Sequence, residues 1–341
     1  MTLSPRTCLS MFVLTVSTLF AAAPPGVTLI GKGSISGSAA DLSGLQGNIC
    51  KLGADPNVTG NCVPKNLLGG LGSDLTYIGF DDVFIAAPDR GPFDGLTNVP
   101  YLNRFHFLHI TVDALAAFPN IATKLLDTRF FKNEVNRTFI GSAGAFDVDP
   151  LASLRLDPEG IRVGFNGTFF ISDEYGPYLF EFERQGHLVQ RFAIPSKFPI
   201  SNPAPDPVVE VTSNTTGRLA NRGMEGLAIT PDGRTLAGIM QSALIQDNGL
   251  NLGTPELDDR LGLTNRILKV DVATGATEEY VYVLDAISRG QGVSEILAIN
   301  DHQFLVLERD NRSFLKPGDS QAPTPAGPGP TPGPQSFPQL C

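Results

Sequence analysis

Acidic residues recur in a paired pattern along the middle of this 341-residue chain. Four segments each begin with a carboxylate, run as a strand pattern, turn, and return as a second apolar strand. They span residues 74–89, 159–174, 225–241 and 295–308, and each ends in an acid except the third, which ends in Gln. An antiparallel hairpin returns the chain to the end where it began. We therefore expect the carboxylates of all four segments to gather at one end of the hairpins.

Clustered carboxylates repel one another unless positive charge offsets them. Ca²⁺ takes six to eight oxygen ligands of this kind, so a divalent cation, and Ca²⁺ in particular, is the expected cofactor. Two alternatives remain open: neighbouring arginines neutralise the acids directly, or the acids cap turns and form ion pairs between repeats. The expected metal ligands are Asp89, Asp94, Glu159, Asp173, Glu174, Glu225, Glu295, Glu308 and Asp310.

A cation held there could polarise a phosphoryl oxygen or lower the pKa of a bound water. An acid that does not bind the cation would then serve as the general base. The candidate catalytic acids are Asp89, Glu159, Glu174, Glu225 and Glu308. Arginines near these acids suit a phosphate or carboxylate on the substrate, and the candidates are Arg90, Arg162 and Arg309.

The elements that must position these residues are short strands. Apolar runs with strand periodicity are separated by turn signals such as Asn166-Gly167 and Pro231-Asp232-Gly233. The 36 glycines and 27 prolines are consistent with many turns. We predict an all-β fold that repeats antiparallel hairpins as the blades of a β-propeller, in which the acid-bearing ends converge on one mouth of a central channel.

Composition excludes several other chemistries. A net charge of −10 argues against a nucleic-acid partner, because phosphate backbones attract basic surfaces. The chain has no Gly-x-Ser-x-Gly elbow for a serine hydrolase and no Cys-x-x-Cys pair for zinc. His106 and His109 lie three residues apart on a predicted strand, so they should point to opposite faces rather than form a metal pair.

Residues 1–23 have the features of a signal peptide: Arg6, an apolar run over residues 8–20, and three alanines. No other segment is apolar over a length that spans a membrane, so we expect a secreted or periplasmic protein. Cys50 and Cys62 bracket a loop that a disulfide could close in an oxidising compartment. Sequons that make glycosylation possible in a eukaryotic host occur at Asn57, Asn136, Asn166, Asn214 and Asn311.

The predicted domain organisation has three parts after the signal peptide. Residues 24–72 form a Gly/Ser-rich segment that leads into the domain, and residues 73–316 form the propeller domain. Residues 317–341 are rich in Pro and Gly without an apolar period, which predicts a disordered or polyproline tail.

Five ordered motifs resemble one family: DRGP, PEGIR, ISDEYGP, GMEGLA and LERDNRS, between residues 89 and 313. Across residues 70–315 the chain is similar to the domain family named for the esterase-like activity of phytase. That resemblance implies an exported protein with phosphoester or ester hydrolysis. Family members usually continue past the ERD motif with further strands, whereas a Pro-rich tail follows here, so we expect a C-terminally truncated domain.

These observations favour an exported, metal-dependent hydrolase of a small phosphoester. One alternative is a non-catalytic extracellular propeller that binds a partner, in which the acids and arginines are structural. Another is a carboxylic ester or lactone hydrolase that uses the same cation on a carbonyl oxygen.

Overall fold

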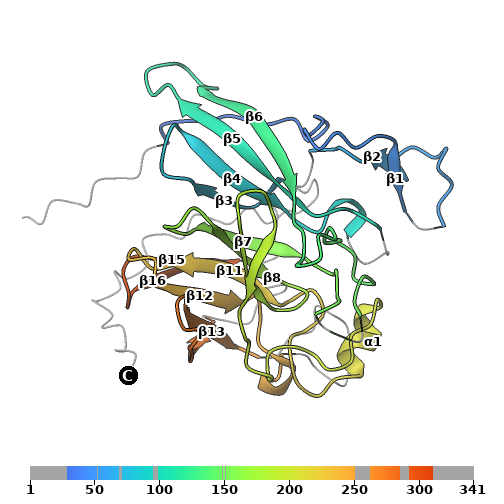
Figure 1. Cartoon of the computed structure of the whole chain (residues 1–341), viewed down its shortest axis with the longest axis vertical. Coiled ribbons are helices and arrows are strands. Elements are labelled where there is room, and N and C mark those ends of the chain that lie inside the picture. The colour runs from blue at the N-terminus through green and yellow to red at the C-terminus, as the bar shows by residue number, and fades with distance from the viewer. Residues whose placement is uncertain are drawn as a thin grey trace, which may run out of the picture.

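The computed structural model describes residues 29–51, 53–68, 71–94, 99–147, 149, 151–249, 262–284 and 292–309. For Asp94 it describes the backbone alone. The predicted signal peptide and the Pro/Gly-rich tail lie outside these residues. The described chain consists almost entirely of antiparallel strands (Figure 1), which confirms the prediction of an all-β, propeller-like repeat of blades.

Four antiparallel sheets follow one another along the chain, and we call them blades 1 to 4. Blade 1 contains β3 (Leu71–Tyr77), β4 (Val83–Pro88), β5 (Arg104–Val112) and β6 (Ile121–Phe130). Blade 2 contains β7 (Pro158–Val163), β8 (Phe169–Asp173), β9 (Leu179–Phe182) and β10 (Leu188–Arg191). Blade 3 contains β11 (Met224–Ile229), β12 (Thr235–Met240), β13 (Thr264–Asp271) and β14 (Thr277–Val283). Among the described residues, blade 4 contains β15 (Gly292–Ala298) and β16 (Phe304–Arg309).

The first strand of each blade packs against the first strand of the next, from β3 to β7, β11 and β15. Figure 1 shows β7, β11 and β15 side by side near the middle of the molecule. Glycine makes this approach possible. A Cβ atom on Gly160 would lie 2.4 Å from Cβ of Leu227, and one on Gly226 would lie 2.8 Å from the backbone nitrogen of Ile296. A larger residue at either position would push two blades apart.

Apolar side chains fill the junctions between successive blades. Between blades 1 and 2 the core is aromatic and includes Phe105, Phe131, Phe169 and Phe182. Between blades 2 and 3 the core includes Phe170, Leu227 and Met240. Between blades 3 and 4 it includes Ala228, Ile239 and Ile296. Because strand side chains alternate between faces, neighbouring residues such as Phe169 and Phe170 serve opposite junctions.

The N-terminal segment contains a small hairpin of β1 (Asn48–Cys50) and β2 (Cys62–Pro64), which a disulfide between Cys50 and Cys62 closes. Asp41 of this segment forms a buried ion pair with Arg104 of blade 1, at 2.6 Å. The loop after blade 2 forms the short helix α1 (Pro207–Thr212), where the Asp206 side chain accepts hydrogen bonds from the first turn. Two short 3₁₀ turns, η1 (Pro92–Asp94) and η2 (Ile245–Asp247), follow β4 and β12.

Candidate functional site

Five carboxylates meet at the ends of the inner hairpins of blades 1 to 3, and we call them the acidic cluster. Oxygen atoms of Asp89, Asp157 and Glu159 lie within 4.8 Å of one another, and so do oxygen atoms of Glu159, Glu174 and Glu225. Glu159 therefore links the two groups. Asp89 follows β4, Asp157 directly precedes β7, and Glu174 follows β8. Three blades thus contribute acids to one site, whereas the hairpin pattern predicts acids from all four.

Each inner hairpin begins with a β-bulge, and a starting acid enters the cluster when it lies within the bulge (Glu159, Glu225) rather than directly after it (Asp74, Glu295). The register shifts at the beginning of all four hairpins: between Leu71 and Asp74, Pro158 and Ile161, Met224 and Gly226, and Val293 and Glu295. Counted back from the last pair before each turn, Asp74 and Glu295 are level with Gly160 and Gly226 rather than with Glu159 and Glu225. The four starting acids therefore occupy two different positions, whereas the sequence pattern treats them as one.

Asp74 and Glu295 meet at Arg162 instead, and we call these three residues the Arg162 centre. Arg162 forms ion pairs with both acids, with an N···O distance of 3.0 Å to Glu295. The Asp74 carboxylate also accepts a hydrogen bond from the Ile161 backbone at 2.7 Å, and Glu295 accepts one from Leu227 at 3.3 Å. These acids fasten each inner strand to the next, and Arg162, predicted as a substrate contact, is bound to both of them.

The remaining predicted residues have other surroundings. Glu308 accepts a hydrogen bond from the hydroxyl of Tyr282 at 2.6 Å. Asp173 is fully buried, and its Oδ1 atom accepts hydrogen bonds from the backbones of Asp157 and Tyr175. The side chain of Asp94 and all of Asp310 lie outside the described residues.

The residue that ends the inner hairpin differs in charge from blade to blade. Counted forward from the turn, Asp89, Glu174, Gln241 and Arg309 occupy the same position in blades 1, 2, 3 and 4. The series therefore runs from two acids through an amide to a cation. The charge of Arg309 acts on Glu225 and lowers the pKa of that carboxyl against the larger effect of burial.

Arg90 is the cation inside the acidic cluster. Its guanidinium lies 2.9 Å from Asp157, 3.5 Å from Asp89 and 3.6 Å from Glu174. Its backbone N–H also donates to Asp157 at 3.0 Å. Burial alone would lower the pKa of Arg90, but the three carboxylates outweigh it and raise that pKa. With 8% of its surface exposed, Arg90 is a built-in countercharge.

The cluster still holds more negative than positive charge. Burial, and then the charge of Glu225, raises the pKa of Glu174 to about 8. Burial raises the pKa of Glu225 to about 7, and burial with neighbouring acids raises those of Asp157 and Glu159 well above their usual range. Among the described side chains three arginines act on the five acids: Arg90, Arg222 and Arg309. When every acid is ionised, two negative charges remain without compensation, which equals the charge of one divalent cation.

A buried carboxylate oxygen without a hydrogen-bond partner also favours a cation site in the acidic cluster. Oε1 of Glu174 is buried and has no hydrogen-bond partner in the described structure, and the hydroxyl of the neighbouring Tyr175 is in the same situation. Buried polar atoms without a partner are rare in proteins because each costs desolvation free energy. The carboxylates of Glu159, Glu174 and Glu225 have raised pKa values and oxygens within 4.8 Å of one another, which fits the oxygen donor set of Ca²⁺.

Two contributors were not among the residues predicted from the sequence. Asp157 binds Arg90 and belongs to the cluster, and its only signal was its place one residue before the Pro158-Glu159 motif. Gln241 replaces the acid that ends the other hairpins. Its amide nitrogen donates to Glu225 at 2.6 Å, while its amide oxygen accepts from Arg222 at 2.5 Å. A carboxylate could not make both contacts, because it has no hydrogen to donate when ionised.

No helix among the described residues is long and apolar enough to cross a membrane. Solved structures that resemble the chain share little sequence with it. They include a protein of unknown function from Bacteroides thetaiotaomicron (9% identity over 66% of this chain and 41% of that chain, TM-score 0.31). The Cps50 (Swd1) β-propeller domain of Myceliophteria thermophila gives 8% identity over 66% and 63%, with a TM-score of 0.23. Apo AztD from Citrobacter koseri gives 13% over 69% and 56%, with a TM-score of 0.24.

A curated relative from Arthroderma benhamiae is 30% identical over 330 residues, which cover 75% of this chain and 62% of the relative. It is described as an uncharacterized secreted protein, and the chain spans less than two thirds of its length. The sequence model of one family matches residues 66–324, which include all four inner hairpins and the acidic cluster. This chain belongs to the phytase-like family, described as esterase-like activity of phytase.

Proposed function

We propose that this chain is an exported, metal-dependent hydrolase of small phosphoesters, and that the acidic cluster is its Ca²⁺ site. One observation carries the proposal: five clustered carboxylates from three blades, of which Asp157 and Glu174 are buried, face three arginines, and a buried oxygen of Glu174 has no hydrogen-bond partner among the described residues. Export is supported by the secreted relative and by the leader-like residues 1–23.

The cation would be held by Glu159, Glu174 and Glu225, with Asp89 and Asp157 within reach of the shared residue Glu159. When bound, it would supply Lewis-acid polarisation of a phosphoryl oxygen. Glu174, whose pKa is raised to about 8, holds a proton on its carboxyl near neutral pH in the metal-free protein and would release it when the cation binds. An acid of the cluster that does not bind the cation would serve as the general base.

The anionic group of the substrate would meet Arg309. This residue ends the inner hairpin of blade 4, level with Gln241 of blade 3, and its charge acts on Glu225. Arg90 and Arg162 are each bound to two or more carboxylates, so we assign them to holding the acids in place. A guanidinium is suited to phosphate because its fork of N–H donors matches two oxygens at once.

The first test is a calcium titration of the full chain, stripped with EDTA, and followed by thermal melting and isothermal calorimetry. We expect saturable stabilisation in the wild type and its loss in Glu174→Gln. Asp301→Asn, an exposed acid in the turn of blade 4, is the control and should behave as wild type. A melting temperature that does not respond to calcium would remove the metal site from the proposal.

The second test is a substrate panel of p-nitrophenyl phosphate, bis-p-nitrophenyl phosphate, phytate, p-nitrophenyl acetate and a γ-lactone, with and without calcium. Turnover of the phosphate compounds alone supports the proposal. Turnover of the acetate or the lactone alone would assign the site to the carboxylic ester alternative. Calcium binding without turnover of any compound would leave a non-catalytic binding module in its place.

A further inference from the structure

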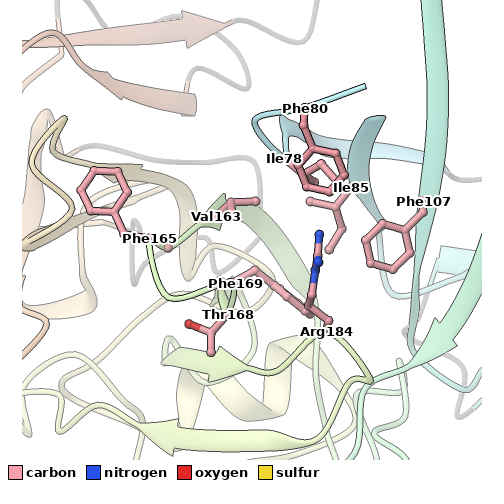
Figure 2. A pocket seen from close by; sticks show the side chains of 11 residues that line it. Ile78, Phe80, Ile85, Phe107, Val163, Phe165, Thr168, Phe169 and Arg184 are labelled. Atoms are coloured by element: carbon pink, nitrogen blue, oxygen red, sulfur yellow. The ribbon is translucent and has the colours of Figure 1, made fainter. Parts of the chain in front are cut away.

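A pocket opens at the turns of the inner hairpins of blades 1 and 2, at the opposite end of these strands from the acidic cluster (Figure 2). Its volume is about 230 Å³. The floor consists of core side chains, Ile85, Phe107 and Phe169, which are at least nine-tenths buried. The walls come from the turns on either side, so the pocket lies where two blades meet.

Two exposed phenylalanines stand at this pocket. The first turn contains Gly79-Phe80 and the second contains Gly164-Phe165, with 49% and 79% of the Phe surfaces exposed. The turns of blades 3 and 4 run through Pro231-Asp232-Gly233 and Asn300-Asp301-His302 instead. Residues of that second kind are usual in tight turns, because they favour the backbone conformation and contact water. Folding the hairpin does not require a phenylalanine there.

Arg184 supplies the cation of the pocket. It lies in the turn between β9 and β10, and its guanidinium is 5.6 Å from the centre of the Phe80 ring. Figure 2 shows its side chain reaching toward Ile85 and Phe80. No carboxylate in the described part of the chain forms an ion pair with Arg184. A guanidinium stacked on an aromatic ring beside apolar walls attracts an anion more strongly than one in open water.

We propose that this aromatic pocket binds a small apolar molecule that carries an anionic group, such as an aromatic carboxylate, sulfonate or phosphate ester. The ring system would lie over Ile85 and Phe107 beside Phe80, and the anion would contact Arg184. The chain has a net charge of −10, so binding an anion requires a local cation, which Arg184 supplies here. This site is independent of the proposed hydrolysis.

The test uses two fluorescent probes on the full chain. 8-Anilinonaphthalene-1-sulfonate has the aromatic rings and the anion, whereas N-phenyl-1-naphthylamine has the same rings without the sulfonate. We expect saturable binding of one sulfonate probe per chain. Arg184→Gln should weaken the sulfonate probe about tenfold, about 1.4 kcal/mol, and leave the neutral probe nearly unchanged. Phe80→Ser should weaken both probes, because it removes apolar contact area.

Lys124→Gln is the matched control, because Lys124 is an exposed cation on β6 that does not line the pocket. It should bind both probes as the wild type does. Arg184 and Phe80 are exposed turn residues, so both variants should fold, and equal melting temperatures would establish this. Sulfonate binding that does not saturate, or that is equally strong in Arg184→Gln, would overturn the proposal. EDTA should leave the binding intact, which separates this outcome from any failure of the calcium site.

Discussion

Two buried glutamates in this chain have carboxyl pKa values that are shifted in opposite directions. Glu210 of α1 is 3% exposed and lies between two arginines, 2.9 Å from Arg155 and 2.7 Å from Arg218. Burial raises the pKa of Glu210, but the two guanidinium groups outweigh burial and lower it. Glu174 is 1% exposed, and Arg90, 3.6 Å away, is shared with Asp157. The pKa of Glu174 is raised to about 8, chiefly by burial.

The contrast shows that the fold is able to neutralise a buried carboxylate with its own residues. It does so completely at Glu210. At the Arg162 centre one arginine and two backbone N–H groups contact the acids, but burial outweighs them and leaves the pKa values of Asp74 and Glu295 raised. In the acidic cluster it does so only in part. A buried ion pair contributes little net stability, but an uncompensated buried charge costs several kcal/mol. The acidic cluster is therefore the place where a cation from solution has the most to contribute.

The largest loss of stability should come from removing the carboxylate of Glu210, which pairs with two arginines. Glu210→Gln leaves Arg155 and Arg218 buried without their carboxylate, and we expect the free energy of unfolding to fall by about 3–5 kcal/mol. Urea denaturation measures this, with Glu183→Gln, on the surface loop between β9 and β10, as the control. A loss below about 1 kcal/mol would mean that the Glu210 site is no better compensated than the acidic cluster.

The next effect should come from removing the countercharge of the cluster. Arg90→Met leaves Asp157 without its guanidinium, and in metal-free protein we expect a loss of about 3 kcal/mol. Calcium should recover part of that loss, because it supplies positive charge among the same oxygens. Unfolding of the variant with and without calcium tests this. An equal loss in both conditions would indicate that no cation reaches these carboxylates.

The hairpins and the mouth at which their acids meet follow from local sequence, because alternation and turn residues act over short distances. Which acids enter the cluster depends on whether the acid lies within the bulge or directly after it, and a one-residue shift changes the face to which a strand side chain points. Asp74 and Glu295 therefore look equivalent to Glu159 and Glu225 in the sequence but bind Arg162 in the structure. No periodic pattern marks such a shift.

The ion pair of Glu210 with Arg155 could not be predicted from the sequence, because the two residues are distant along the chain. Arg155 and Glu210 are 55 residues apart, on a loop and on a six-residue helix, and neither lies in a repeating unit. Their pairing depends on how the loop after blade 2 folds back, which local propensity does not determine. Acids that recur with a repeat can therefore be predicted from the sequence. Acids whose partners depend on tertiary packing cannot.

A smaller effect should appear as pH dependence in the metal-free protein. The pKa values of Glu174, Glu225 and Asp173 are raised to about 8, 7 and 6, so between about pH 5 and pH 8 the folded state binds more protons than the unfolded chain. The free energy of unfolding should therefore fall by about 1–3 kcal/mol as pH rises across that window. Calcium should reduce the slope, because it favours the ionised carboxylates. A metal-free stability that rises with pH across this window would contradict the assignment.

The smallest effect should come from Gln241, the residue that partly compensates Glu225. Gln241→Met removes the hydrogen bond to Glu225 and the acceptor for Arg222, and we expect a loss of about 1 kcal/mol, measured by urea denaturation against Gln185→Met in an exposed turn. Gln241→Glu is the sharper variant, because it adds a sixth carboxylate at nearly constant shape. It should lower metal-free stability and tighten calcium binding together, since more oxygen donors with more charge bind this ion better. If Gln241→Glu lowers stability and leaves calcium affinity unchanged, Arg222 has neutralised the new acid, and blade 3 resembles the Glu210 site rather than the metal site.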